Sequence, residues 1–395
     1  MPMNIHGFFK TICADLKFNA KLFLSNLCFA ILIILLLIPI NLSAQDESQL
    51  YLDGSFISGI TKEGDNLWVA TYGDGIFRYS YKDDEWENFS TKNKQIDNDL
   101  FGTIAANKDY VWAGSNDGLY TYDKKRDKWR KRKFAAGGEM GNWIRALTYD
   151  SNKNYLWIGR FINLTMLDVR RRRFTDFDLT IHNDAKTNDI ISIGLDGDSL
   201  VWFGTESGVH IYDKRKNIKD KSAWSFITNK NKGFQEDGDA VSISQILCEG
   251  NYIWFGTDEF ITKESPQFNL GGIYRYNRRF SWDKISTQSG LPANGVYSMQ
   301  RTGNTIWASL YSFNKNEKKE YGQGIVLINR FNGISTPINL NKTDLSSSEI
   351  HALYFDGTYM WVGSSKGLWR VTIANPLAKW YAVKEKPKKN VRRKK

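Results

Sequence analysis

Seven tryptophans that recur at regular intervals constrain the fold of this chain most strongly. Similar residues surround each of them, as in N-L-W-V-A-T, Y-V-W-A-G-S and L-V-W-F-G-T. The spacings between consecutive members are 44, 45, 45, 52, 53 and 54 residues. Self-similarity at such a period is typical of repeat architectures. The series comprises Trp68, Trp112, Trp157, Trp202, Trp254, Trp307 and Trp361.

Each repeat is expected to form four short strands. The first carries apolar residues three positions apart, as in Phe101 and Ile104, and the second contains the repeat tryptophan. A glycine turn then leads to a third strand such as G-L-Y-T-Y at 118–122. The fourth strand carries a further aromatic residue, and these residues are Trp86, Trp129, Phe174, Trp224, Trp282 and Trp380.

The repeats predict an all-β protein. A single four-stranded unit cannot bury both of its faces, so neighbouring units must stack. Radial stacking of such units produces a β-propeller, here one with seven four-stranded antiparallel blades. The repeat tryptophans are then expected to form the core between blades. A 14% aromatic content and only 7 prolines fit strands joined by tight turns.

The repeats resemble the two-component-regulator propeller repeat, whose pattern is approximately V-x-x-I-x-x-D-x-x-G-x-L-W-x-G-T-x-x-G-L-x-x-Y. S-G-L-P-A-N at 289–294 is similar to the loop that precedes each repeat of that family. The resemblance covers about residues 50–383, without a kinase or regulator domain. Blade 3 departs from the pattern, because R-F-I-N-L-T replaces the glycine turn. The resemblance implies a periplasmic sensor-type propeller, which in that family commonly responds to carbohydrate fragments.

The N-terminal 44 residues predict export. Residues 22–40 are uncharged and mostly apolar, lysines precede them, and Ala44 offers a small residue for cleavage. This pattern is typical of a secretory signal peptide, although 19 such residues can also span a bilayer uncleaved. We therefore expect a signal peptide or retained anchor at 1–44, a propeller at 45–383, and a location in the periplasm or at the cell surface.

The net charge of +11 is concentrated at the C-terminus. Residues 379–395 hold nine Lys/Arg and one Glu, so the propeller itself is nearly neutral. We expect 384–395 to be a disordered basic tail, either inert or a tether to an anionic membrane or polysaccharide. Export argues against a nucleic-acid partner.

Long loops are concentrated on one predicted face of the propeller. Insertions at 258–270 and 311–322 fall between second and third strands, and three long blade connections lie on the same face. Extra loop length on one face usually marks the binding face of a repeat protein. Aromatic rings beside Arg and Glu suit sugars, because rings stack on C–H surfaces while polar groups bind hydroxyls. The predicted ligand-binding residues are Tyr72, Trp143, Arg145, Arg160, Phe161, Glu206 and Tyr311.

Basic residues cluster near the hairpins between third and fourth strands, on the opposite face. They protect edge strands by charge, or they contact an anionic surface or partner. The residues of this predicted basic face are Lys131, Arg132, Arg170, Arg171, Arg172 and Arg173.

Catalysis is not expected. Beyond the N-terminal segment Cys248 is the one cysteine, and neither an H-E-x-x-H zinc motif nor a phosphate-binding glycine loop occurs. We therefore expect no cofactor and no metal. Three hypotheses remain: a module that binds carbohydrate or an envelope protein, a structural scaffold of an envelope or secretion assembly, and a carbohydrate-active enzyme with a carboxylate pair.

Overall fold

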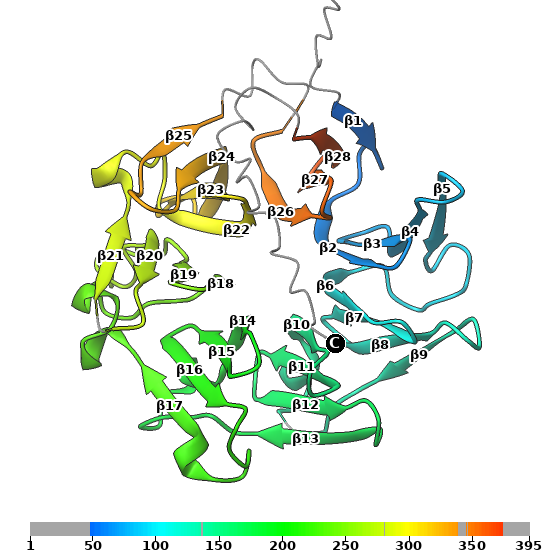
Figure 1. The fold of residues 1–395 in the computed structure, drawn as a ribbon, viewed down its shortest axis with the longest axis horizontal. Coiled ribbons are helices and arrows are strands. Elements are labelled where there is room, and N and C mark those ends of the chain that lie inside the picture. Colours follow the sequence, from blue (N-terminus) through cyan, green and yellow to red (C-terminus); the bar gives the residue numbers. More distant parts are fainter. Residues whose placement is uncertain (1–47, 136, 280, 339–344, 346, 374–395) are drawn as a thin grey trace, which may run out of the picture. The chain divides into compact units, whose positions relative to one another are not determined.

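The computed structural model describes residues 48–373 except 136, 280, 339–344 and 346. The predicted signal peptide and anchor, the basic tail and Trp380 lie outside the described residues. Seven four-stranded sheets are arranged in a ring (Figure 1). All strand pairs within the blades are antiparallel. The predicted seven-bladed β-propeller is therefore confirmed.

The strands of blades 1 to 3 are β2 (Ile57–Glu63), β3 (Asn66–Thr71), β4 (Ile76–Ser80), β5 (Glu85–Phe89), β6 (Phe101–Ala106), β7 (Tyr110–Ser115), β8 (Gly118–Asp123), β9 (Lys128–Arg132), β10 (Ile144–Asp150), β11 (Tyr155–Arg160), β12 (Leu164–Asp168) and β13 (Arg173–Phe177). The strands of blades 4 and 5 are β14 (Ile190–Asp196), β15 (Leu200–Thr205), β16 (Gly208–Asp213), β17 (Trp224–Ile227), β18 (Gln245–Cys248), β19 (Ile253–Gly256), β20 (Ile273–Tyr276) and β21 (Trp282–Ile285). Blade 6 contains β22 (Gly295–Thr302), β23 (Thr305–Asn314), β24 (Lys319–Asn329) and β25 (Ser335–Pro337). Blade 7 contains β26 (Ile350–Phe355), β27 (Tyr359–Ser364), β28 (Gly367–Thr372) and β1 (Ser48–Tyr51).

Short 3-10 helices occur in the connections after the blades or within them. They are η1 (Met140–Asn142), η2 (Ala185–Asn188), η3 (Lys221–Ala223), η4 (Asn229–Asn231), η5 (Phe234–Glu236) and η6 (Thr287–Ser289). None of the helices in the described part of the chain is long and apolar enough to cross a membrane.

Blade 7 corrects one prediction. Its outer strand is β1, from the start of the described chain, which pairs with β28 through Ser48↔Val371 and Tyr51↔Leu368. The prediction had placed the aromatic of this fourth strand at Trp380. The strand closes the ring, because the Tyr51 ring lies between Trp361 of blade 7 and Trp86 of blade 1.

The repeat tryptophans form the core between blades, as predicted. Their exposed fractions range from 0% to 7%. Each packs against residues of the next blade, as when the Trp157 ring meets Phe203 and Tyr212. Burying a large aromatic side chain contributes strongly to stability, so seven of them hold the ring together.

A bulge explains why apolar residues are three apart in the first strands. The pairing register of β2, β6, β10, β14 and β26 shifts after the first residue, and that of β22 shifts after the second. One extra residue is therefore inserted between two buried positions, such as Phe101 and Ile104. Bulges re-aim side chains and often lie next to functional sites.

Candidate functional site

The candidate site lies on the long-loop face, where the innermost strands begin. In four blades the amide four residues after the repeat tryptophan donates to a carbonyl one to three residues before the first strand. These bonds are Tyr72 to Phe56 (2.9 Å), Phe161 to Trp143 (3.0 Å), Asp258 to Ser242 (3.1 Å) and Ser365 to Glu349 (3.1 Å). Two side chains per blade are thereby placed side by side. We call these positions, together with the bulge residues, the inner rim.

On blade 3 the inner rim carries a stacked aromatic pair. The ring planes of Trp143 and Phe161 are inclined by only 4° to each other, and their centroids are 5.6 Å apart. Trp143 is 41% exposed, so part of its indole is open to solvent. The bulge residue Arg145 places its guanidinium carbon 5.6 Å and 5.8 Å from the two ring centroids.

Blade 4 supplies the acidic half of this group. Arg145 forms an ion pair with Asp189 and lies 3.8 Å from a Glu206 carboxylate oxygen. Burial raises the pKa of Asp189 to about 7, even though Arg145 lowers it, and the Glu206 carboxylate adds to the increase. The residues Trp143, Arg145, Phe161, Asp189 and Glu206 are called the blade 3–4 cluster below.

A second polar group continues the inner rim on blades 5 and 6. The Tyr311 hydroxyl donates to Asp258 (3.0 Å), and the Ser242 hydroxyl donates to the other oxygen of that carboxylate (2.5 Å). The bulge residue Tyr297 stacks on the Tyr311 ring at 4.4 Å. Burial raises the pKa of Asp258 above its usual value, so this carboxyl holds its proton at higher pH than an exposed one.

The two inserted segments form a raised wall beside this polar group. β23 and β24 continue their pairing from Tyr311↔Gly322 to Asn314↔Lys319. Phe313 of this extended hairpin packs against Phe260 of the blade 5 insertion, with ring centroids 5.0 Å apart. The wall therefore borders one side of the inner rim.

Arg160 does not line the surface, which corrects its place among the predicted ligand contacts. Its side chain is fully buried, donates to the Gly141 carbonyl (2.8 Å) and lies 3.2 Å from Asp176. The same position in five other blades holds Thr or Ser, whose hydroxyl donates to a carbonyl across the next turn, as from Thr71 to Gly75 (2.8 Å). Arg160 therefore supports the loop that leads to Trp143.

The two remaining predicted contacts lie apart from the blade 3–4 cluster. Tyr72 is 52% exposed on blade 1, with its ring 6.1 Å from Phe56. Tyr311 is 2% exposed, so its hydroxyl holds Asp258 instead of presenting a stacking surface. Blade 3 lacks the glycine turn of the other repeats, and Asn163 takes its place. The φ of Asn163 is 76°, which is the left-handed conformation that glycine provides elsewhere.

Sequence reasoning missed Asp189, Tyr297, Glu320 and His351. His351 lies between the rings of Phe56 (4.3 Å) and Tyr297 (4.5 Å). Their position in the repeat could have indicated two of them, because Tyr297 and His351 occupy the same bulge position in their blades as Arg145 does in blade 3. Asp189 immediately precedes its first strand, as Trp143 does.

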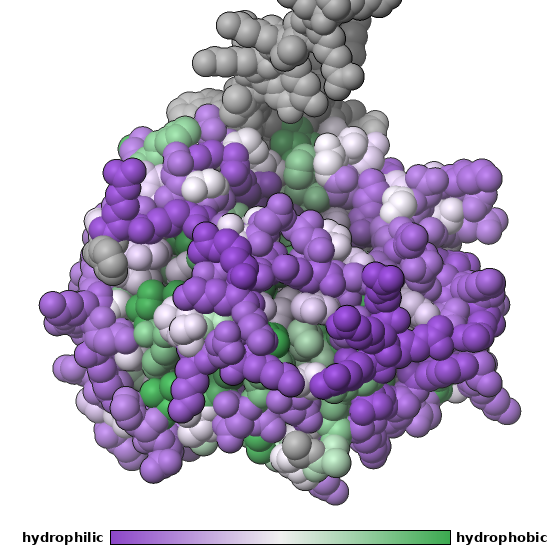
Figure 2. All heavy atoms as spheres, turned by 60° about the horizontal axis from the view of Figure 1, so that its bottom comes forward, coloured by the Kyte–Doolittle hydropathy of each residue, from purple (hydrophilic) through white to green (hydrophobic). Residues whose placement is uncertain are grey.

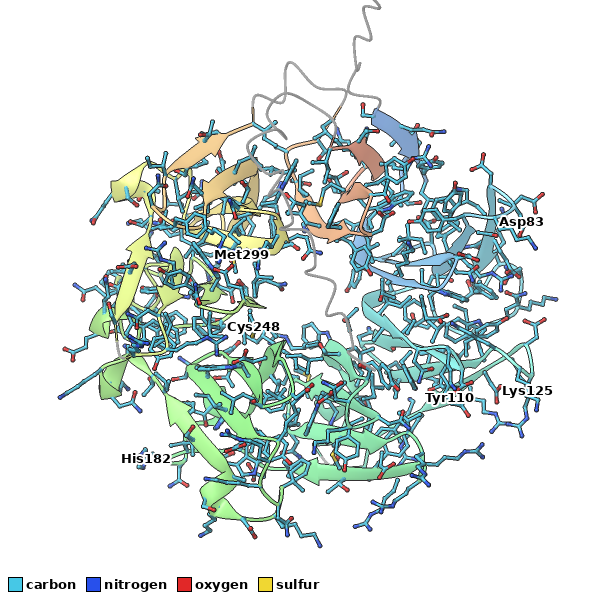
Figure 3. All side chains as sticks on the ribbon, viewed as in Figure 1. Asp83, Tyr110, Lys125, His182, Cys248 and Met299 are labelled. Carbon is cyan, nitrogen blue, oxygen red and sulfur yellow. The ribbon has the colours of Figure 1, made fainter. Side chains whose placement is uncertain are left out.

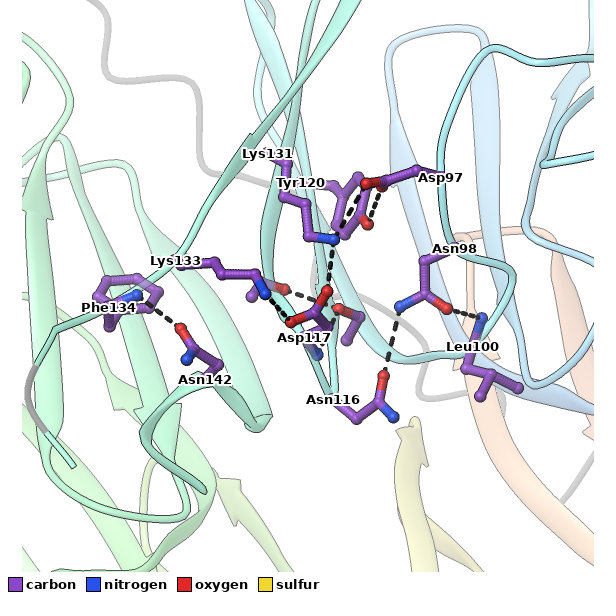
Figure 4. A network of polar contacts seen from close by, with 12 residues as sticks. Asp97, Asn98, Leu100, Asn116, Asp117, Tyr120, Lys131, Lys133, Phe134 and Asn142 are labelled. Carbon is purple, nitrogen blue, oxygen red and sulfur yellow. Dashed lines mark hydrogen bonds and ion pairs between the residues drawn. The ribbon is translucent and has the colours of Figure 1, made fainter. Parts of the chain in front are cut away.

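The predicted basic face separates into two parts. Arg170, Arg171, Arg172 and Arg173 are exposed in the β12–β13 hairpin, as expected. Lys131 and Arg132 lie at the far end of β9, on the long-loop side, which corrects their assignment. There Lys131 contacts Asp97 (3.1 Å) and Asp117 (2.5 Å), as Figure 4 shows, while Arg132 lies over the Phe174 ring.

Neither a nucleophile elbow nor a metal-binding cluster occurs among the described residues. G-S-S-K-G at 363–367 matches the G-x-S-x-G pattern, but it forms the tight turn between β27 and β28. The nucleophile elbow of hydrolases instead joins a strand to a helix. No group of three or more metal-ligating side chains occurs among residues with described positions.

One pocket of about 360 Å³ lies between blades 4 and 5, away from the inner rim. Its walls include Trp202, Tyr276 and Arg278. The charged group of Arg278 is already bound to Asp196 (2.8 Å) and to the Glu249 carbonyl (2.7 Å). The pocket is lined by polar and apolar groups together, and its arginine is already paired, so the inner rim is the better candidate for recognising a polar ligand.

Comparison with known proteins places the chain among propellers. No family model matches it. It is 24% identical over 318 residues to Histidine kinase P4 of Formosa agariphila, which corresponds to 75% of this chain and 22% of the kinase. The chain thus spans about a fifth of that relative.

Solved structures share the fold at low sequence identity. The extracellular domain of a protein described as a hybrid two-component system of B. thetaiotaomicron has a TM-score of 0.60 and 14% identity, covering 84% of this chain and 42% of that one. Virginiamycin B lyase from Staphylococcus aureus has a TM-score of 0.59 and 13% sequence identity, and the match covers 83% of this chain and 99% of the lyase. PorZ, a surface component of the type-IX secretion system of Porphyromonas gingivalis, has a TM-score of 0.53 and 12% sequence identity. The match covers 81% of this chain and 37% of PorZ.

The similar structures thus include the extracellular domain of a two-component system protein, in agreement with the resemblance of the repeats. They also include a lyase and a secretion component, so one propeller architecture accompanies three different roles. At these identities the likeness establishes the fold of the chain as a seven-bladed β-propeller.

Proposed function

We propose that this chain is an exported, non-catalytic propeller that binds a carbohydrate at the inner rim. The observation that carries the proposal is the blade 3–4 cluster, where four of the predicted contacts converge from two blades. An exposed indole face offers a stacking surface for sugar C–H groups, and Arg145 and Glu206 offer a donor and an acceptor for hydroxyls.

The surrounding rim supports the same ligand class. Desolvation raises the pKa of the half-buried Asp258, so this carboxyl offers a polar contact that keeps its proton at higher pH than an exposed aspartate. The raised wall of Phe260 and Phe313 adds an apolar border. A flat ligand with several hydroxyls fits an inner rim that carries aromatic rings on blades 1, 3 and 6 and carboxyl groups on blades 4 and 5.

The test is binding of the exported chain to an array of oligosaccharides, followed by titration of the best ligand. Trp143→Ala should weaken binding about tenfold or more, as expected for loss of an aromatic anchor. Phe331→Ala is the matched control, since Phe331 is 54% exposed on the β24–β25 connection of the opposite face. Equal binding by both variants would contradict the proposed site.

Two alternatives give different results in related experiments. A carbohydrate-active enzyme would consume the bound sugar, and substitution of one carboxylate such as Asp258 would abolish turnover. A scaffold of an envelope or secretion assembly would co-purify in stoichiometric amounts with envelope proteins and would show no saturable sugar binding.

A further inference from the structure

Three neighbouring blades carry strongly basic hairpins on the face opposite the inner rim. Because blades 1 to 6 are simple meanders, the connections between their third and fourth strands all emerge at this face. Residues 123–130 hold five basic and two acidic side chains. Residues 168–173 hold four basic side chains and one acidic one, and residues 213–221 hold five basic and two acidic side chains. The hairpins belong to blades 2, 3 and 4.

Each hairpin neutralises one arginine internally. Asp123 binds Arg126 (2.8 Å), Asp168 binds Arg171 (3.3 Å) and Asp213 binds Arg215 (2.8 Å). Two lysines are also satisfied, since Lys124 pairs with Glu63 and the buried Lys214 pairs with Asp150 (3.0 Å). Five cations of these hairpins are therefore neutralised within the fold.

Eight exposed cations on these hairpins form neither an ion pair nor a side-chain hydrogen bond with any residue whose position is described. We call them the basic rim, and they are Lys125, Lys128, Arg130, Arg170, Arg172, Arg173, Lys219 and Lys221. Charge at the edge strands β9 and β13 would explain Lys128, Arg130 and Arg173. It does not explain Lys125, Arg170, Arg172, Lys219 and Lys221, because these lie in the connections, beyond the paired edges.

Blade 1 shows that the charge is not a general property of these hairpins. Its equivalent segment, residues 80–85, contains Lys82 with Asp83, Asp84 and Glu85. Asp83 and Lys125 extend from the outer edge of neighbouring blades in Figure 3. The positive charge is thus concentrated on blades 2 to 4, while the shorter hairpin of blade 5 adds Arg278 and Arg279. Figure 2 shows that the surface over the lower blades of the ring is largely hydrophilic, with apolar areas that are small and scattered.

We propose that the basic rim docks this face of the propeller on a bilayer surface rich in anionic phospholipid headgroups. Three consecutive hairpins at one face of a ring present their cations to a planar surface together. Clusters of four to eight Lys/Arg are typical of such contacts, and each contributes about fivefold to membrane affinity at physiological salt. Docking through this face leaves the inner rim directed away from the bilayer.

The test is sedimentation of the full chain with phosphatidylcholine vesicles containing 30% phosphatidylglycerol, compared with pure phosphatidylcholine vesicles. Combined Arg170→Glu, Arg172→Glu and Arg173→Glu substitutions should lower the partition coefficient about a hundredfold or more. The control combines Lys92→Glu, Lys230→Glu and Lys366→Glu, which changes total charge equally at exposed positions of the long-loop face. This control variant should bind vesicles nearly as well as the parent, because its basic rim is intact. Both variants keep the same termini, so the termini contribute equally to binding.

Thermal unfolding at equal temperatures would confirm that both variants fold. Equal loss of vesicle binding in the two variants would overturn the proposal, because net charge alone would then account for it. Unchanged binding by the arginine variant would also overturn it. Binding to heparin that depends on the three arginines, without binding to vesicles, would assign the surface to an anionic polysaccharide instead. Sugar binding at the inner rim is unaffected by any of these outcomes.

Discussion

The indole of Trp143 and the ring of Phe161 lie within 4° of parallel, with centroids 5.6 Å apart. The two residues lie at the same end of the pairing between β10 and β11, just outside the pair Ile144↔Arg160. One backbone hydrogen bond between them fixes the pair. An exposed aromatic surface is therefore held rigidly on blade 3.

Trp143 and Trp157 should differ sharply in their effect on stability. Trp157→Ala removes a fully buried side chain and should lower the free energy of unfolding by about 3–5 kcal/mol. Trp143→Ala, at a half-exposed rim position, should cost only about 1 kcal/mol. Urea unfolding of both variants measures the difference. A large loss of stability for Trp143→Ala would mean that the indole has a structural role.

Asp189 should make the protein less stable as the pH rises from about 4 to about 7. Its pKa in the folded protein is about 7, against 3.8 for an exposed aspartate. In this interval the unfolded chain has lost the proton that the folded protein keeps, so deprotonation favours unfolding. The contribution of this group changes by at most about 1.4 kcal/mol per pH unit and levels off above pH 7.

Asp189→Asn isolates this contribution, because Asp258, Glu259 and Glu320 also have raised pKa values and act in the same direction. The stability of the variant relative to the parent should increase between pH 4.5 and 7.5. Urea unfolding at several pH values gives the two curves. Parallel curves would contradict the assignment of the raised pKa to Asp189.

Arg160→Ala should disturb the candidate site without removing a surface contact. The substitution deletes a charged hydrogen bond to Gly141 and leaves space beside Phe134, at an expected cost of about 2–4 kcal/mol. The loop before Trp143 should then become more mobile, which amide hydrogen exchange at 138–143 would detect. Arg160→Lys should not restore protection, since an ammonium cannot reach Gly141 and Asp176 as a planar fork does. Unchanged exchange in Arg160→Ala would contradict a supporting role.

Tyr51 should be needed to close the ring. Its ring contacts Tyr79 (5.8 Å) and Trp86 (5.5 Å) of blade 1 and Trp361 (5.7 Å) of blade 7. Tyr51→Ala should lower the free energy of unfolding by about 2–4 kcal/mol, whereas Phe331→Ala should cost less than about 1 kcal/mol. Thermal unfolding of the two variants makes the comparison. Similar melting temperatures would show that β1 contributes little to closure.

The sequence by itself determined the number of blades, the tryptophan core and the face that carries the long loops. These features repeat locally, because each blade needs its own buried tryptophan and its own turns. It also indicated the three-residue spacing in the first strands, although the bulge that causes this spacing is visible only in the pairing register.

Only the tertiary structure decided which rim residues meet. Arg145 joins Asp189 across 44 positions of sequence, and this contact depends on how two blades pack. Arg160 and Tyr311 are of residue types that often contact ligands, yet packing buries both side chains. Closure by β1 joins residues more than 300 positions apart, as in Tyr51↔Leu368. Repeat periodicity specifies each blade locally, whereas the site arises between blades, where non-repeating side chains from distant segments come together.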